Sequence, residues 1–134
     1  IAYAKKEDFI LTLPSGRSLN YGKVTTALHD GRRNYMAMLT KGSKKIPLRQ
    51  WGGLVAENIS QALARDIFAD MLLRIEEAGI EIIFHVHDEF IIEVDEAKSE
   101  ETLDIVIESM SEAPKWIPDI PLAAEGKILD RYEK

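Results

Sequence analysis

The sequence predicts an α+β fold, in which an antiparallel sheet carries two helices packed on one face. Short runs rich in β-branched and aromatic residues are separated by turn signals, as expected of hairpins. Two longer stretches instead repeat apolar residues every three or four positions, as expected of amphipathic helices. The resulting order is three strands, a helix, two strands, a helix and a strand, which is typical of an α+β domain.

The first third of the chain is predicted to form strands and loops, because β-branched and aromatic residues are frequent in it. The expected strands cover residues 9–13, 18–28 and 34–40. A Pro-Ser-Gly turn at 14–16 separates the first two strands. Asp30-Gly31, between the second and the third, marks a hairpin. Residues 41–47 contain Gly42 and Pro47, and we interpret them as a basic loop.

The strongest helical pattern follows Gly52-Gly53 and ends at Gly79, which sits where a glycine C-cap belongs. Its apolar stripe consists of Val55, Ile59, Ala62, Leu63, Ile67, Met71, Leu72 and Ile75. Beyond this helix we expect two apolar strands joined by a short polar tip, then a second helix and a last strand. These elements are expected over residues 80–84, 90–94, 97–113 and 120–128.

The composition excludes several classes of protein. The chain has 134 residues, 46% of them apolar and 30% charged, which favours a single globular domain over a disordered tail. It contains no cysteine, which excludes disulfides, zinc–thiolate sites, iron–sulfur clusters and thiol catalysis. We expect a cytoplasmic protein with no membrane partner, because the sequence has neither a long apolar run nor a signal peptide. The first residue is not Met, so we expect a piece of a longer protein.

The net charge of −6 argues against a nucleic-acid partner when it is taken as a whole. The charge is, however, unevenly spread. Residues 1–51 contain ten basic and three acidic residues, which gives a charge of +7. Residues 52–134 contain seven basic and twenty acidic residues, which gives a charge of −13. A basic segment attached to an acidic one can bind a polyanion. Two solvated faces of opposite charge explain the same distribution equally well.

The side chains with catalytic potential are concentrated at the expected tip, which contains His85, His87, Asp88 and Glu89. A turn at Asp88 would bring Asp88 and Glu89 together. Such acids are out of place between apolar strands unless something pairs with them, and Mg²⁺ or Mn²⁺ suits oxygen ligands of this kind. The alternative is a polar hairpin turn whose acids face solvent.

Two stretches carry a family resemblance. Residues 57–67 and the later sequence His85-Val86-His87-Asp88-Glu89-Phe90 together resemble the C-terminal palm of family A DNA polymerases, the bacterial polymerase I and phage class, and most closely its phage and prophage branch. The segments 13–17 and 120–126 resemble a hairpin and the last palm strand of the same branch. The resemblance implies a single domain over 1–134 with a palm-type sheet. Residues 1–51 would form a basic segment of strands and loops. Residues 52–134 would form a helix-hairpin-helix-strand segment.

The resemblance also implies a function, namely template-dependent DNA synthesis by nucleotidyl transfer with two Mg²⁺ ions, Mn²⁺ being possible. Asp88 matches a metal-binding catalytic aspartate, and Glu89 matches the adjacent acid that assists the metal site less directly. His87 matches a residue close to the primer terminus. Gln61 matches a helix glutamine that contacts the minor groove near the primer end. Arg65, four residues after Gln61, is expected to reach the DNA backbone.

Other parts of the family pattern have no counterpart in this sequence. The motif with the other metal-binding aspartate and the nucleotide-binding helix are both missing. We therefore interpret the chain as the C-terminal part of a DNA polymerase, cut after the fingers and inactive alone. Its partners would be the missing N-terminal polymerase regions, primer–template DNA and dNTP.

Two further hypotheses stay open at this point. In the first, the chain is a small metal-dependent hydrolase with His85, His87 and Asp88 as ligands. Both imidazoles would then converge on one metal. The polymerase hypothesis instead expects Asp88 and Glu89 to be exposed at a tip with His85 packed away. In the second, the chain is a non-catalytic interaction module whose acidic helix at 97–113 binds a basic partner.

Overall fold

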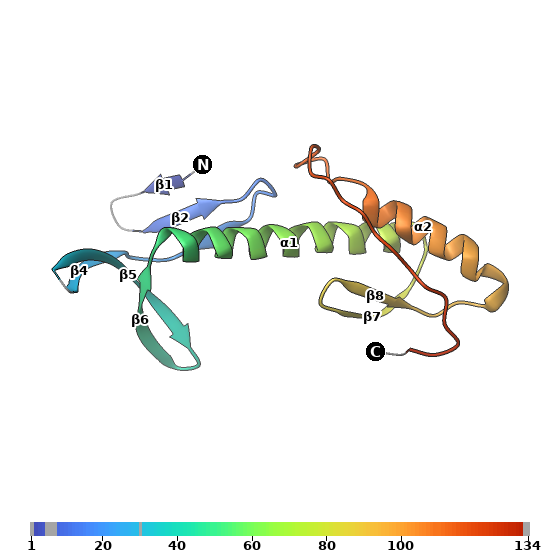
Figure 1. Ribbon diagram of the computed structural model, residues 1–134, viewed down its shortest axis with the longest axis horizontal. Coiled ribbons are helices and arrows are strands. Elements are labelled where there is room, and N and C mark those ends of the chain that lie inside the picture. Colours follow the sequence, from blue (N-terminus) through green and yellow to red (C-terminus); the bar gives the residue numbers. More distant parts are fainter. Residues whose placement is uncertain (1, 5–7, 30, 133–134) are drawn as a thin grey trace. The chain divides into compact units, whose positions relative to one another are not determined.

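A computed structural model describes residues 2–4, 8–29 and 31–132 of the chain. Its antiparallel strands and two α-helices confirm the α+β class (Figure 1). The described strands form three separate small sheets, whereas the sequence had predicted one. The chain divides into two compact units, Ile1–Leu63 and Ala64–Lys134.

The first sheet contains β1 (Ala2–Ala4), β2 (Phe9–Thr12) and β3 (Ser18–Asn20), paired antiparallel in that order. The predicted turn at 14–16 is confirmed. The Leu13 backbone N–H donates to the Arg17 carbonyl at 2.8 Å, and Gly16 has a φ of +87°, which glycine adopts without a steric penalty.

The second sheet contains β4 (Thr25–His29), β5 (Arg32–Lys41) and β6 (Lys44–Gln50). The pairing of β4 with β5 confirms the predicted hairpin, although Asp30 itself lies outside the described residues. The prediction of a basic loop at 41–47 is wrong, because β6 begins at Lys44 and pairs with β5 across a short turn. Gly42 supplies the positive φ at that turn. Pro47 is tolerated because β6 lies at an edge of the sheet, where a missing N–H costs little.

The long helix α1 (Gly52–Glu77) confirms the helical prediction. Ala62, Ile67, Met71 and Ile75 of the predicted stripe are buried, and Phe68, which the stripe omitted, is buried with them. The helix ends in a Schellman motif. The Ile80 N–H donates to the Ile75 carbonyl at 3.3 Å and the Gly79 N–H donates to the Glu76 carbonyl at 2.9 Å, with Gly79 at a φ of +81°.

The third sheet is the predicted hairpin of β7 (Ile82–Val86) and β8 (Glu89–Ile92). A short 3₁₀ turn, η1 (Glu96–Lys98), leads into α2 (Ser99–Ser111), which confirms the second helix. The last strand predicted at 120–128 is wrong, because this segment pairs with no described strand. Ile120 and Leu122 pack instead on a core cluster of α1 that consists of Ile67, Phe68 and Met71.

Candidate functional site

The polar tip between β7 and β8 is a two-residue turn, narrower than the sequence had suggested. Val86 is paired with Glu89, so only His87 and Asp88 lie in the turn itself. His85 belongs to β7, and Glu89 is the first residue of β8. Asp88 and Glu89 are both exposed to solvent. The hairpin therefore presents two consecutive carboxylates at its end, one in the turn and one at the first paired position.

His87 has an unusual backbone conformation. Its φ is +54°, and it is the one non-glycine residue with a positive φ among those described. The left-handed region costs an L-residue about 1–2 kcal/mol, although His enters it more readily than most side chains. Two-residue hairpin turns need a positive φ at their first central position and usually fill that position with Gly or Asn. A histidine here carries an energetic cost that those residues would avoid.

The hairpin is held against α1 by aromatic packing. His85 and Phe90 are directly opposite each other on neighbouring strands, so their side chains share one face. Phe90 stacks on the buried Phe68 ring at a centroid distance of 4.1 Å and an interplanar angle of 8°. The His85 ring meets the same Phe68 edge-on at 5.5 Å. Phe68 thus fixes the strand residues on either side of the turn.

The His85 ring contacts Phe68, but the residue is exposed, so the expectation of the polymerase hypothesis that His85 is packed away is wrong. The hydrolase hypothesis needs His85, His87 and Asp88 on one metal. Within 2–4, 8–29 and 31–132, no three His, Asp or Glu side chains come together as a potential metal site. The tip supplies carboxylate oxygens, which suit Mg²⁺, but only as part of a larger ligand set.

Gln61 and Arg65 both lie on α1 and are both exposed. They are four residues apart, which places them one helical turn from each other on the same side of the helix. Gln61 belongs to the unit that ends at Leu63, and Arg65 to the unit that begins at Ala64.

Two contacts next to Gln61 were not foreseen from the sequence. The Arg17 Nη2 donates to the carbonyl of Ala62 at 2.9 Å, and the Asn58 Nδ2 donates to the Tyr21 hydroxyl at 3.1 Å. In the sequence, Arg17 is only the last residue of the segment 13–17 that resembles a hairpin. These bonds hold the β2–β3 hairpin on the part of α1 that carries Gln61. A mid-helix carbonyl is normally bonded within its helix, so no sequence pattern identifies Ala62 as a second acceptor.

Comparison with known proteins identifies one informative similarity. The sequence is 40% identical over 126 residues to the DNA polymerase of Bacillus phage SP02. The matched segment covers 91% of this chain but only 19% of that polymerase, an extent that fits a polymerase fragment. The similarity confirms the predicted resemblance to a phage DNA polymerase. No protein-family model matches the sequence, and no solved structure matches it. Within the described residues, no helix combines the length and apolar character needed to cross a bilayer.

Proposed function

We propose that this chain is the C-terminal palm part of a family A, phage-type DNA polymerase that catalyses template-dependent DNA synthesis in the cytoplasm. The observation that carries the proposal is the His87-Asp88-Glu89 tip, where exposed carboxylates end a hairpin that is packed firmly on a long helix. The 40% identity to a phage DNA polymerase supports it independently. The remaining polymerase regions, primer–template DNA and dNTP are the partners in the intact enzyme.

In this proposal Asp88 is a direct ligand of Mg²⁺, which Mn²⁺ can replace, and Glu89 assists the same site. A pair of such ions, when bound, activates the primer 3′-hydroxyl and stabilises the charge on the departing pyrophosphate. Asp88 and Glu89 supply only part of the ligand set, since no third acidic or imidazole ligand joins them within the described ranges. The further aspartate comes from the polymerase regions that precede this segment. Asp88 and Glu89 also bring negative charge toward anionic substrates, which the cations neutralise.

The neighbouring residues position the DNA. His87, in the turn itself, lies next to the proposed metal ligand in the chain and contacts the primer terminus. Gln61 reads the minor groove near the primer end, and Arg65 contacts the backbone one helical turn further on. The exposure of Gln61 and Arg65 leaves both side chains accessible for these contacts.

The test is Asp88→Ala in the intact polymerase. Losing several kcal/mol of transition-state stabilisation lowers primer extension by roughly a thousandfold or more, since each 1.4 kcal/mol is tenfold in rate. Binding to primer–template DNA is largely retained. Asp104→Ala is the matched control, because it removes an exposed aspartate from α2, away from the turn. Near-normal extension by the Asp88 variant would refute the proposal, as would primer extension by the purified 134-residue chain alone.

A further inference from the structure

The β4–β5–β6 sheet has a strongly basic surface that the proposed catalytic site does not use. Six of its residues are basic and exposed, namely Arg32, Arg33, Lys41, Lys44, Lys45 and Arg49. None of the six forms an ion pair within the part of the chain that the structure describes. Asp30 is the one acidic residue between Asp8 and Glu57 in the sequence. Apart from Asp30, which lies outside the described residues, no acidic residue between positions 9 and 56 is available to neutralise the positive charge of this sheet.

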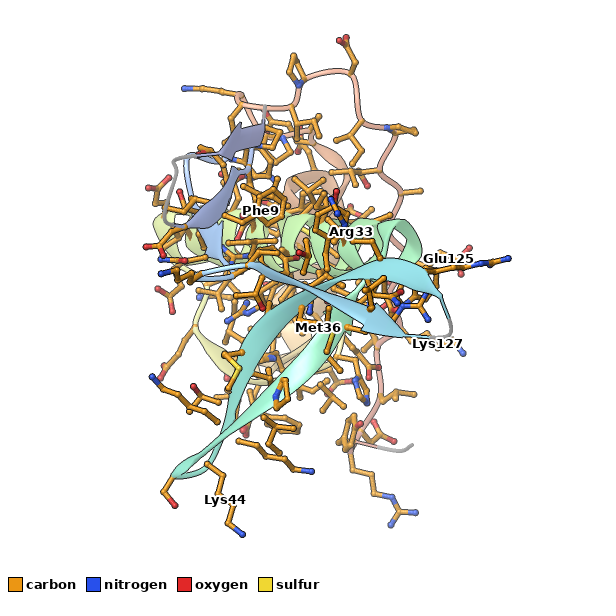
Figure 2. All side chains as sticks on the ribbon, turned by 90° about the vertical axis from the view of Figure 1, so that its left-hand side faces the viewer. Phe9, Arg33, Met36, Lys44, Glu125 and Lys127 are labelled. Atoms are coloured by element: carbon orange, nitrogen blue, oxygen red, sulfur yellow. The ribbon has the colours of Figure 1, made fainter. Side chains whose placement is uncertain are left out.

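The charges are most concentrated at the turn between β5 and β6. Lys41 and Lys44 are directly opposite each other in the register, and Lys45 follows on the opposite face of the same strand. Like charges placed directly across a strand pair destabilise it. An anion bound between these lysines would remove that repulsion. Figure 2 shows Lys44 at the free end of the β5–β6 hairpin, with Arg33 toward the other end of β5 and Met36 between them.

The same region is a narrow two-stranded ribbon. The β4 strand pairs with β5 only as far as Met36, whereas the β5–β6 pairing continues to the Lys41–Lys44 pair. Beyond Met36 the ribbon has no third described strand. It presents lysines on both faces. The major groove of DNA admits a two-stranded ribbon between two rows of phosphates. The eight-residue separation of Arg33 and Lys41 corresponds to roughly 27 Å of strand, or about eight base pairs of duplex.

We propose that the β5–β6 ribbon binds the phosphate backbone of duplex DNA through Lys41, Lys44 and Lys45. The inference rests on the proposed polymerase function and adds a second DNA contact, outside the His87-Asp88-Glu89 tip. Duplex DNA fits better than an acidic protein segment, because its major groove admits a two-stranded ribbon and its phosphates supply a high and regular density of negative charge. The ribbon thus explains how a chain with a net charge of −6 contacts a polyanion.

Binding of the 134-residue chain to a fluorescent duplex of about 20 base pairs tests the inference, measured between about 50 and 200 mM salt. The ribbon variant is K41Q/K44Q/K45Q. The control variant is K98Q/K115Q/K127Q, which removes the same charge from three exposed lysines in the other unit. If each ribbon lysine contacts one phosphate, the slope of log affinity against log salt becomes shallower by about 2.7, and affinity at about 0.1 M salt falls at least tenfold. The control variant retains the slope of the unmodified chain.

Three outcomes would overturn the inference. They are an unchanged slope in the ribbon variant, an equal loss in the control variant, and no detectable binding by the unmodified chain at about 50 mM salt. Binding of polyglutamate as tight as that of the duplex, with the same dependence on the ribbon lysines, would assign the surface to an acidic protein instead. These outcomes are separable from failure of the polymerase proposal, which depends on primer extension by the Asp88→Ala enzyme and not on binding by the ribbon.

Discussion

Phe68 is the side chain on which the position of the candidate site depends, and its truncation gives the sharpest test of the structure. It is 7% exposed and contacts both Phe90 and His85, which lie on either side of the turn that contains Asp88. Phe68→Ala removes a buried ring from a core where such truncation costs about 3–5 kcal/mol in the free energy of unfolding. Stacking on Phe90 contributes about 0.5–1.5 kcal/mol of that. Phe68→Leu keeps most of the apolar volume and should cost only about 1–2 kcal/mol.

Urea unfolding followed by tryptophan fluorescence measures these differences. The sequence has two tryptophans, and Trp116 packs on the cluster that contains Phe68. A Trp51→Phe background therefore leaves a single reporter in the unit that carries the hairpin. Leu73→Ala is the control, because Leu73 lies on the same helix but is 59% exposed, so its truncation should change stability by less than about 0.5 kcal/mol.

The expected order of destabilisation is Phe68→Ala, then Phe68→Leu, then Leu73→Ala. A Phe68→Ala cost near that of Leu73→Ala would show that Phe68 is not buried against the hairpin, and the account of how the tip is held would be wrong. Equal costs for the Ala and Leu variants of Phe68 would show that the apolar volume at this position makes no separate contribution to the free energy of unfolding.

Two further predictions concern other supports of the site. Arg17→Ala removes the hydrogen bond to the Ala62 carbonyl and should lower the free energy of unfolding of the unit Ile1–Leu63 by about 1–2 kcal/mol. Urea titration with Trp51 as the fluorescent reporter measures this change, and a difference within error would count against the bond. His87→Gly should leave the free energy of unfolding unchanged or raise it by up to about 1 kcal/mol, because Gly adopts a positive φ freely. His87→Val should lower the free energy of unfolding by about 1–2 kcal/mol, because a β-branched residue adopts this φ poorly. If His87 contacts the primer end, both variants should slow extension by the intact polymerase, whatever their stability; normal extension by the Gly variant would assign His87 a purely structural role.

Local sequence signals predicted most of the elements. The α1 prediction succeeded because a three-and-four apolar repeat and a C-terminal glycine agreed with each other, and Gly79 does close the helix. The β7–β8 hairpin was predicted because two apolar runs flank a polar tip. The prediction of a basic loop at 41–47 was wrong because Gly42 and Pro47 each suggested a loop, whereas β6 begins at Lys44. Gly42 lies in the turn, whereas Pro47 lies in an edge strand. A strand accommodates proline only at such an edge, and the sequence of a strand does not show whether it lies at an edge.

The errors in the sheet share one physical cause. A strand exists only when another segment accepts and donates its backbone hydrogen bonds, and that partner is not encoded in the strand's own residues. Residues 120–128 are apolar enough to form a strand, but Pro121 lacks a donor, and Ile120 and Leu122 are committed to the α1 cluster. The division into three sheets could not be predicted for the same reason.

The candidate site could be located from the sequence because its residues are consecutive. The contacts that hold the site in place could not be predicted from the sequence. Phe68 is separated from His85 and Phe90 by the end of α1 and the start of the hairpin, and no periodic pattern links the three. Arg17 and Ala62 are further apart still. Such contacts depend on how the helix and hairpins pack, which is a property of the folded chain.

The conformation of the turn itself argues that folding stability did not determine its residues. A two-residue hairpin turn with a positive φ at its first position is most stable with Gly or Asn there, and this chain has His87 at +54°. Asp88 and Glu89, which follow, are exposed carboxylates adjacent in the chain, and neutral polar residues there would avoid the repulsion between their charges. Departures from the locally favoured choice are most often found where a function requires them. A histidine at a positive φ beside two exposed carboxylates is unusual for a plain solvent-exposed hairpin, and this departure marks the tip as a candidate functional site.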